Sequence, residues 1–368
     1  MRAAVLYEAR QSMAIEEISL DGPRDDEVLV RVDATGACHS DYHVIDGSWH
    51  GPGFPLPVVL GHEAAGTVEK IGADVRHVRP GDRVILSFAP SCGRCRTCTL
   101  GQPHLCQGFR YQPGRFVDGT RRHRKGDLEI NCFGGGMSSF AELSVVHHSA
   151  AVKIDPEMPM TGAALIGCAV MTGVGAVLNT ARVEPGATIA VFATGGVGLS
   201  VVQGGVLANA SRIIAVDLLD NKLEYARGLG ATDMINSSRV DPVAAIKELT
   251  GGRGVDYAFD AIGSPKVSRA CYDAVRRGGT AVIVGMAPTG SEISIPGTIP
   301  GDEKTVKGCF YGSTRPAVDF PRLVDFYLRG KLKLDQMVTR TYRLDQINEA
   351  FDALGRGENA RGLITPNE

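Results

Sequence analysis

Four cysteines lie close together in the sequence, at a spacing that lets their thiolates close on one metal ion. They are Cys92, Cys95, Cys98 and Cys106. Four thiolates at such intervals are typical of tetrahedral structural zinc, which binds sulfur at about 2.3 Å. Residues 90–108 are therefore predicted to form a zinc-stapled lobe. Such a site organises a loop and performs no reaction by itself.

Two alternatives to zinc fit this stretch less well. A bacterial iron–sulfur run has three residues before its last cysteine and a proline after it, whereas seven residues separate Cys98 from Cys106 here and Gln107 follows. A disulfide framework needs paired cysteines and an oxidising compartment. The chain has nine cysteines, an odd number, and its opening residues do not resemble a signal peptide.

The composition predicts a two-domain protein without affinity for nucleic acid or membranes. The 368 residues exceed one ordinary core, and 39 Lys+Arg against 41 Asp+Glu give a formal net charge of -2. That balance attracts neither nucleic acid nor an anionic membrane. The basic run from Arg121 to Lys125 is interpreted as a solvated loop. No apolar run of membrane-spanning length is expected, and we predict a cytoplasmic protein.

The pattern of apolar residues changes between about residues 150 and 170. Before it, short alternating runs such as Glu27 to Val32 and Gly66 to Ile71 predict β-strands. After it, short apolar runs alternate with helix-length segments, which predicts a parallel sheet covered by helices. The strands expected in that sheet are Thr188 to Phe192, Arg212 to Val216, Val255 to Phe259 and Thr280 to Val284. Beyond residue 310 the pattern is mixed and does not assign a domain.

A glycine-rich turn follows the first strand expected in the parallel sheet. Its sequence, Ala193-Thr194-Gly195-Gly196-Val197-Gly198, is the dinucleotide fingerprint G-x-G-x-x-G with alanine in the first place. Gly195 lets the backbone approach a pyrophosphate, and Gly198 lets the helix pack on the strand. Alanine fits the tight turn if its φ is negative. The backbone from Gly195 to Gly198 is therefore predicted to bind a dinucleotide cofactor.

Asp217 ends the next expected strand, nineteen residues after Gly198. A carboxylate in this place hydrogen-bonds the 2′-hydroxyl of the cofactor ribose. A 2′-phosphate would meet like charge there, so NAD is favoured over NADP. Arg212 and Lys222 are near enough in sequence to keep NADP as an alternative.

Two further motifs contain residues that bind metal ions. Cys38 lies in the run from Gly36 to His43, and His62 follows twenty-four residues after it in Gly61-His62-Glu63-Ala64-Ala65-Gly66. With the four-cysteine lobe and the dinucleotide turn, in this order, they resemble the zinc-dependent medium-chain alcohol dehydrogenases over essentially the whole chain. The resemblance implies an α/β protein with a GroES-like β-barrel catalytic domain and a Rossmann doubly wound parallel-sheet cofactor domain. The implied domains are residues 1–168, residues 169–310, and a C-terminal segment, 311–368, that returns to the catalytic domain.

The resemblance implies two zinc ions per chain, one catalytic and one structural, together with NAD(H). The catalytic ligands would be Cys38, His62 and Cys168, the Cys₂His set known from alcohol dehydrogenase, which leaves a fourth position open. Cys132 competes with Cys168, which is preferred because the segment that begins with it matches the family segment before the cofactor domain. Zinc in such a site acidifies a hydroxyl and polarises a carbonyl, so hydride exchange between an alcohol and nicotinamide is the implied chemistry.

Further roles are implied by motif position alone. Ser40 and His43 would relay the proton, Asp41 would orient His62, and Glu63 would lie behind the metal. The other expected cofactor contacts are His39, Thr172, Lys222 and Arg361. The residues expected in the substrate cleft are Trp49, Phe88 and Phe140. Each of these three aromatic side chains fits an ordinary core position equally well.

The predicted activity is the interconversion of alcohols with aldehydes or ketones. An apolar cleft favours primary, medium-length or aromatic alcohols. The long segment from Gly108 to Gly136 resembles the formaldehyde dehydrogenase branch of the family, but the acidic pair which that branch uses near Trp49 for a thiol conjugate is not found. Two other classes are a zinc-binding interaction or nucleic-acid module with an inactive oxidoreductase fold, and a zinc-free quinone reductase relative or structural protein. The family forms dimers and tetramers, and a homodimer is expected here.

Overall fold

The computed structural model describes residues 1–48, 54–109 and 112–368, which divide into two compact units. The first unit contains Met1–Cys168 and Arg315–Glu368, and the second contains Ala169–Thr314. The C-terminal segment therefore packs with the N-terminal part of the chain.

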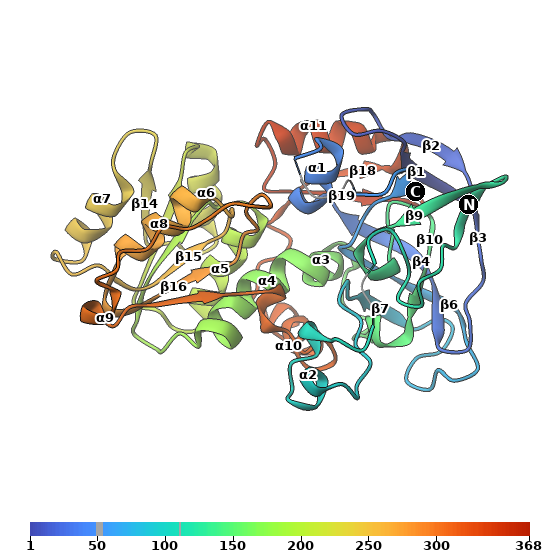
Figure 1. Cartoon of the computed structure of the whole chain (residues 1–368), viewed down its shortest axis with the longest axis horizontal. Helices are drawn as coiled ribbons and strands as arrows, with labels where there is room; N and C mark the ends of the chain where they lie inside the picture. The colour runs from blue at the N-terminus through green and yellow to red at the C-terminus, as the bar shows by residue number, and fades with distance from the viewer. Residues whose placement is uncertain (49–53, 110–111) are drawn as a thin grey trace. The chain divides into compact units, whose positions relative to one another are not determined.

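The first unit is built on two β-sheets (Figure 1). The six-stranded sheet has the order β2 (Ala14–Glu17), β1 (Arg2–Leu6), β5 (Val58–Val59), β9 (Leu128–Cys132), β8 (His123–Lys125) and β3 (Ser19–Leu20). The seven-stranded sheet has the order β11 (Ala151–Lys153), β7 (Arg83–Leu86), β6 (Ala64–Ile71), β4 (Glu27–Gly36), β19 (Arg361–Thr365) and β18 (Val338–Arg343), with β10 (Leu143–His147) paired to β4. Antiparallel pairing of Leu363 with Gly36 joins the C-terminal segment to the central strand β4.

Short helices complete the first unit. They are α1 (His39–Ile45), α2 (Arg96–Thr99), α3 (Met160–Leu165), α10 (Pro316–Leu328) and α11 (Ile347–Gly355), with 3-10 turns at Pro103–Leu105, Gly134–Gly136, His148–Ala150 and Leu344–Gln346. The alternation of apolar and polar residues in Glu27 to Val32 reflects the two faces of strand β4. Val28, Val30 and Val32 point into the core and are fully buried. A second core cluster joins Phe140 and Phe351 under α11.

The second unit is a parallel sheet with helical crossovers. Its strands have the order β14 (Asp233–Asn236), β13 (Arg212–Asp217), β12 (Thr188–Phe192), β15 (Val255–Asp260), β16 (Val275–Ile283) and β17 (Thr305–Gly308). The connecting helices are α4 (Met171–Gly175), α5 (Gly196–Leu207), α6 (Asp220–Gly228), α7 (Pro242–Leu249), α8 (Pro265–Ala274) and α9 (Ile299–Asp302), and a 3-10 turn spans Tyr311–Ser313. Counted along the chain, the strand order is 3-2-1-4-5-6, the doubly wound order of a Rossmann sheet. The predicted parallel sheet is confirmed.

One helical stretch corrects a prediction from the sequence. Met160–Ala181 is 22 residues long and contains α3, α4 and the π-helical segments Ile166–Val170 and Ala176–Ala181. A window of 18 residues within it has a mean hydropathy of 1.8. By length and composition this stretch is apolar enough to cross a membrane, so the expectation that no such run exists is wrong. Glycines and threonines interrupt the run in the sequence while the average stays high. In the structure 89% of the apolar window is buried inside the protein, as in a core helix.

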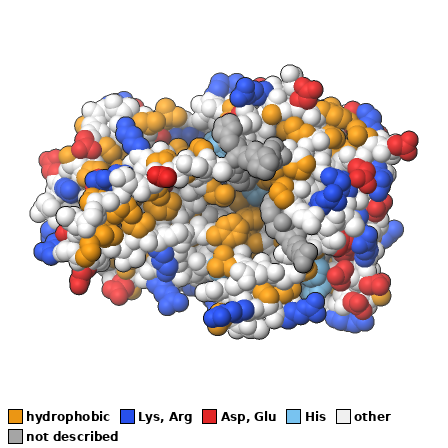
Figure 2. Space-filling view, in the orientation of Figure 1, with side chains coloured by type: hydrophobic (Ala, Val, Ile, Leu, Met, Phe, Trp, Pro, Cys, Tyr) orange, Lys and Arg blue, Asp and Glu red, His pale blue; other side chains and the backbone are white. Residues whose placement is uncertain are grey.

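Charged side chains of both signs are interspersed over the face shown in Figure 2. This distribution agrees with the near-neutral charge balance of the sequence.

Candidate active site and metal centres

Three of the predicted metal ligands converge inside the first unit. Cys38 precedes α1, His62 lies between β5 and β6, and Cys168 lies in the π-helical segment Ile166–Val170. All three side chains are buried, and their ligand atoms lie within 4.8 Å of one another. His62 Nε2 is 3.3 Å from Cys168 Sγ. Tetrahedral zinc separates its sulfur and nitrogen ligands by roughly 3.5–3.8 Å, so the set fits zinc.

The electrostatics of this set favour a thiolate on Cys38. A hydrogen bond from Cys168, together with His62 and Arg361, holds the pKa of Cys38 well below its usual value against the opposing effect of burial. A lowered pKa favours the thiolate, which is the form that binds metal ions.

The pKa values do not separate the two candidates for the third ligand: burial raises the pKa of the Cys132 thiol to about 12, and the hydrogen bond with Cys38, followed by burial, raises the pKa of Cys168 well above its usual value. The placement does separate them, because Cys132 packs in the core with Phe116 and Val145, whereas Cys168 lies with Cys38 and His62. This placement supports Cys168 as the third ligand.

Asp41 holds the imidazole of His62 from behind. Its Oδ2 is 3.1 Å from His62 Nδ1, and its Oδ1 accepts a hydrogen bond of 2.9 Å from the backbone N–H of Gly61. This pairing leaves Nε2 to face the thiols and fixes the ring orientation, as a carboxylate does for many ligand histidines. Asp41 is fully buried, and that burial raises its pKa.

Glu63 and Arg361 form a buried ion pair beside the metal ligands. Gly36 makes this pair possible, because a Cβ at residue 36 would lie 2.6 Å from Glu63 Oε2 and 2.8 Å from Arg361 Nη2. The pair joins β19 of the C-terminal segment to the start of β6. The predicted contact of Arg361 with a cofactor pyrophosphate stays a prediction.

Aromatic rings surround the ligand histidine. Phe88 and Phe133 both lie with their ring centroids 5.5 Å from that of His62, in edge-on orientations of 82° and 77°. Phe54 packs against Phe133 at 5.3 Å. The sequence interpretation missed Phe133 and Phe54. The available signal for Phe133 was its place next to Cys132, the residue that competes with Cys168 for the third ligand position.

The other two predicted cleft residues are placed differently. Phe140 has no exposed surface and packs against Phe351 at 5.5 Å in the core. Core packing accounts for this ring without a substrate, and its role in a cleft stays a prediction. Trp49 lies outside the described residues.

The glycine-rich turn joins β12 to α5 in the second unit. Ala193 has a φ of +69°, so the condition of a negative φ is not met and the alanine occupies the left-handed region. A Cβ at Gly198 would overlap the carbonyl oxygen of Ala193, which explains the glycine there. A Cβ at Gly195 would meet nothing within 4 Å. The backbone at Gly195 thus faces open space at the N-terminus of a twelve-residue helix, a favourable place for an anion.

The remaining predicted cofactor residues of the second unit lie on its strands and helices. Asp217 ends β13, while Thr172 on α4 and Lys222 on α6 are both buried. Their contacts with a cofactor stay predictions.

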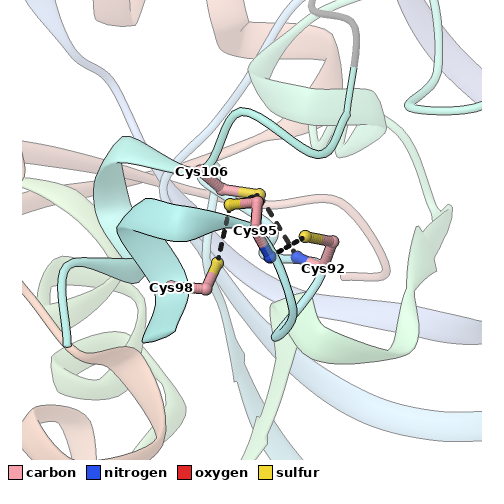
Figure 3. A group of neighbouring side chains, drawn as sticks. All are labelled: Cys92, Cys95, Cys98 and Cys106. Atoms are coloured by element: carbon pink, nitrogen blue, oxygen red, sulfur yellow. Dashed lines mark hydrogen bonds between the residues drawn. The ribbon is translucent and has the colours of Figure 1, made fainter. Parts of the chain in front are cut away.

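The four cysteines of the lobe also converge, as Figure 3 shows. Cys95 Sγ lies 3.5 Å from Cys98 Sγ and 3.8 Å from Cys106 Sγ. Backbone N–H groups of residues 92, 95, 107 and 108 donate to sulfurs of the set at 3.3–3.4 Å. The Thr97 hydroxyl, followed by the N–H groups of Cys98 and Gln107, lowers the pKa of Cys95 to about 5. Burial, followed by the neighbouring Cys95 and Cys106, raises the pKa of Cys98 to about 12. The geometry of the lobe thus places four sulfurs around a position for one ion.

Comparisons with known proteins match both units. Residues 24–156 match the family described as alcohol dehydrogenase GroES-like domain, and residues 196–329 match that of zinc-binding dehydrogenase. The chain is 38% identical to alcohol dehydrogenase class-3 of Cereibacter sphaeroides over 99% of each chain. It is also 38% identical to S-(hydroxymethyl)glutathione dehydrogenase of Saccharomyces cerevisiae, over 100% of this chain and 96% of the relative. The chain belongs to the zinc-dependent medium-chain alcohol dehydrogenase family.

A solved structure agrees with this assignment. Benzyl alcohol dehydrogenase from Acinetobacter calcoaceticus is 35% identical, with a TM-score of 0.92 over 99% of this chain and 98% of that one. The GroES-like and Rossmann folds expected from the sequence are confirmed. This alcohol dehydrogenase is an NAD-dependent zinc enzyme, and the predicted catalytic zinc, structural zinc and NAD(H) are confirmed as its cofactors.

The predicted proton relay of the dehydrogenase lies on α1. Ser40 and His43 are three residues apart on this helix and so share one side of it. His43 Nδ1 is 2.8 Å from the hydroxyl oxygen of Ser48. His39 lies on the same helix, with its ring centroid 6.2 Å from that of His43. The helix thus presents the three side chains directly after the ligand Cys38, and their roles stay predictions.

Proposed function

We propose that this dehydrogenase interconverts primary, medium-length or aromatic alcohols with their aldehydes, using NAD(H). The observation that carries this proposal is the pair of aromatic rings, Phe88 and Phe133, edge-on to the ligand His62. Apolar walls beside a metal exclude water and favour apolar substrates over charged ones. Aromatic substrates gain further from edge-to-face contacts with such rings. The similarity to a benzyl alcohol dehydrogenase supports this class.

The chain's own residues would do the following in the reaction. When bound, zinc acidifies the alcohol hydroxyl and polarises the carbonyl product, and NAD accepts the hydride. Cys38, His62 and Cys168 hold the metal, and Asp41 keeps the imidazole of His62 in the ligating orientation. Ser40 would hydrogen-bond the hydroxyl of the substrate and pass its proton on, and His43, whose Nδ1 lies 2.8 Å from the Ser48 hydroxyl oxygen, would carry the proton to solvent by way of the cofactor ribose.

A second candidate substrate is an S-(hydroxymethyl)thiol conjugate. It is favoured by the 38% identity to S-(hydroxymethyl)glutathione dehydrogenase of yeast. Against it stands the missing acidic pair near Trp49 in the sequence. A zinc-free quinone reductase or an inactive interaction protein fits less well, because both cysteine-containing ligand sets converge in the structure.

The test is kcat/KM for benzyl alcohol, hexanol, ethanol and S-(hydroxymethyl)glutathione, each with NAD and with NADP. We expect benzyl alcohol or hexanol with NAD to be the best pair. Phe133→Ala should lower kcat/KM for benzyl alcohol by about tenfold or more while changing that for ethanol by less than about threefold. Phe320→Leu, a change at a fully buried phenylalanine of α10, is the matched control and should not alter the ratio of the two kcat/KM values. Preference for the glutathione conjugate would overturn the proposal.

We further propose a cytoplasmic homodimer, with the first unit carrying the metal centres and the second binding NAD. Light scattering should then give twice the chain mass of 39.0 kDa. Four times that mass would instead show the tetramer. Recovery of the enzyme in the membrane fraction of its cell would contradict the cytoplasmic location.

A further inference from the structure

Asp217 is anchored by Thr194, the second residue of the glycine-rich turn. Its Oδ2 accepts hydrogen bonds from the backbone N–H of Thr194 at 2.7 Å and from the Thr194 hydroxyl at 3.0 Å. Its Oδ1 accepts bonds from the N–H groups of Leu218 and Leu219 at 2.8 and 3.1 Å. Both oxygens are thus engaged by donors of the second unit. The carboxylate at the end of β13 is held in one orientation.

The contact between Thr194 and Asp217 connects the glycine-rich turn with the carboxyl end of β13. Thr194 has no exposed surface and directly follows Ala193, whose φ of +69° is unfavourable for a residue with a Cβ. Two hydrogen bonds to a charged acceptor offset part of that strain, because bonds to charged groups are stronger than neutral ones. The same contact therefore holds the turn that receives the phosphates and the acid expected to receive the ribose.

We infer that Thr194 is a positioning residue that sets the preference of this enzyme for NAD over NADP through Asp217. This inference rests on the proposed binding of NAD by the second unit. A carboxylate held in place accepts the ribose 2′-hydroxyl without first losing rotamer freedom. The fixed negative charge also opposes a 2′-phosphate. Without the Thr194 hydroxyl, three backbone N–H groups still bond the carboxylate but hold it less firmly, so binding of NAD weakens and NADP is excluded less strictly.

The same sheet contains a matched control at its opposite end. At the start of β12, Thr188 donates to Asp256 Oδ2 from its backbone N–H at 2.7 Å and from its hydroxyl at 2.8 Å. The atoms and geometry are those of the Thr194–Asp217 contact. This contact lies at the amino ends of parallel strands, whereas dinucleotides bind at the carboxyl ends. Loss of the Thr188 hydroxyl thus removes the same bond to a carboxylate without touching the cofactor site, together with one further bond that this hydroxyl accepts from the N–H of Asp256 at 3.1 Å.

The experiment measures the binding of ADP-ribose and 2′-phospho-ADP-ribose by calorimetry, which needs no turnover. Thr194→Val should weaken ADP-ribose binding about fivefold and reduce the discrimination against the 2′-phosphate by at least about threefold. Thr194→Ser keeps the hydroxyl and should restore both values to within about twofold. With benzyl alcohol, KM for NAD should rise in Thr194→Val while kcat stays within about twofold. Thr188→Val should leave all of these values unchanged.

The possible outcomes separate the inference from the function on which it rests. If the wild-type enzyme binds neither nucleotide, the assignment of NAD to the second unit fails. If the wild type binds ADP-ribose and Thr194→Val keeps the same ratio of affinities for ADP-ribose and 2′-phospho-ADP-ribose, the positioning role of Thr194 is overturned. The assignment of NAD to the second unit then still stands. An equal shift in Thr188→Val would reveal a general loss of stability and overturn the positioning role as well. If Thr194→Val does not fold, Thr194→Ala, which also lacks the hydroxyl, is compared with Thr194→Ser in the same way.

Discussion

The two metal centres of this dehydrogenase are built by different means. The ligands of the lobe lie within one short stretch, are partly exposed, and receive backbone N–H···S bonds from their own neighbours. The ligands of the catalytic set come from three distant segments, are buried, and depend on an ion-paired carboxylate behind them. Local geometry therefore suffices to form the first centre. The second exists only when β4, β6 and the long helix are packed together.

The largest effect expected from this difference concerns the third catalytic ligand. Cys168→Ser should lower kcat by about a thousandfold or more, because the ion that stabilises developing charge is lost or misplaced. Metal analysis should show one zinc per chain instead of two. Cys132→Ser is the matched control, since this thiol is equally buried and should retain both zinc ions and most activity. Loss of zinc in Cys132→Ser, with retention in Cys168→Ser, would reverse the ligand assignment.

A change in the lobe should affect stability more than chemistry. Cys98→Ser removes one of four ligands from a site whose metal binding contributes to folding. We expect one zinc per chain, a lower Tm and rapid proteolysis within residues 90–108, while the zinc of the catalytic set is retained. Thr99→Ala, at an exposed neighbouring position, serves as the control. If Cys98→Ser instead loses both zinc ions, the two centres are not independent.

Removal of the Asp41 carboxylate, which contacts the ligand His62, should have an intermediate effect on zinc binding. Asp41→Asn keeps the shape of the side chain but weakens the contact with His62 Nδ1. The affinity of the catalytic site for zinc should fall about 10–100-fold. Competition with a chelator provides the measurement, and the lobe serves as the internal standard because its zinc should not respond. An unchanged affinity would show that packing alone orients the imidazole.

The smallest expected effect is the loss of protein stability in acid that is caused by His147, a residue near the lobe. Ser149 bonds both His147 Nδ1 and the N–H of Ser91, next to the lobe ligand Cys92. Burial, and then the charge of His148, lowers the pKa of His147 to about 4, against a weaker opposing effect of Asp26. Because the unfolded chain takes up this proton near pH 6.5 and the folded chain only near pH 4, stability falls as the pH drops through that window.

The measurement is the free energy of unfolding in urea between pH 7 and 4.5. His147→Gln keeps an acceptor for Ser149 but does not titrate, so its stability should fall less steeply with acid than that of the wild type. Parallel curves for the two proteins would show that His147 does not contribute.

The start of the dinucleotide-binding fold and the four-cysteine lobe were both predictable from the sequence, for the same physical reason. Thr188 to Phe192 followed by the turn to Gly198 is a strand, a tight turn and a helix within a few residues of each other. The four lobe cysteines are likewise close in sequence. Short-range patterns of this kind are constrained by backbone geometry alone. Family resemblance was needed to connect Cys38, His62 and Cys168.

Other features depended on packing that no pattern displays. Phe140 and Phe133 are both aromatic residues of one glycine-rich segment, yet Phe133 contacts the ligand imidazole while Phe140 packs in the core. The sequence also did not reveal the left-handed φ of Ala193, and the expectation that no apolar run reaches membrane-spanning length was wrong for Met160–Ala181. Each depends on which neighbours surround the residue after folding.

By itself, the sequence determined the local chemistry of this protein: thiolates close enough to share an ion, and a glycine turn followed at a fixed distance by an acid. Only the tertiary structure decided which distant groups meet, including the imidazole between Phe88 and Phe133 and the threonine that holds Asp217. The reason is that short segments are restricted by covalent geometry, whereas contacts between distant segments are selected by burial and hydrogen bonding across the whole fold.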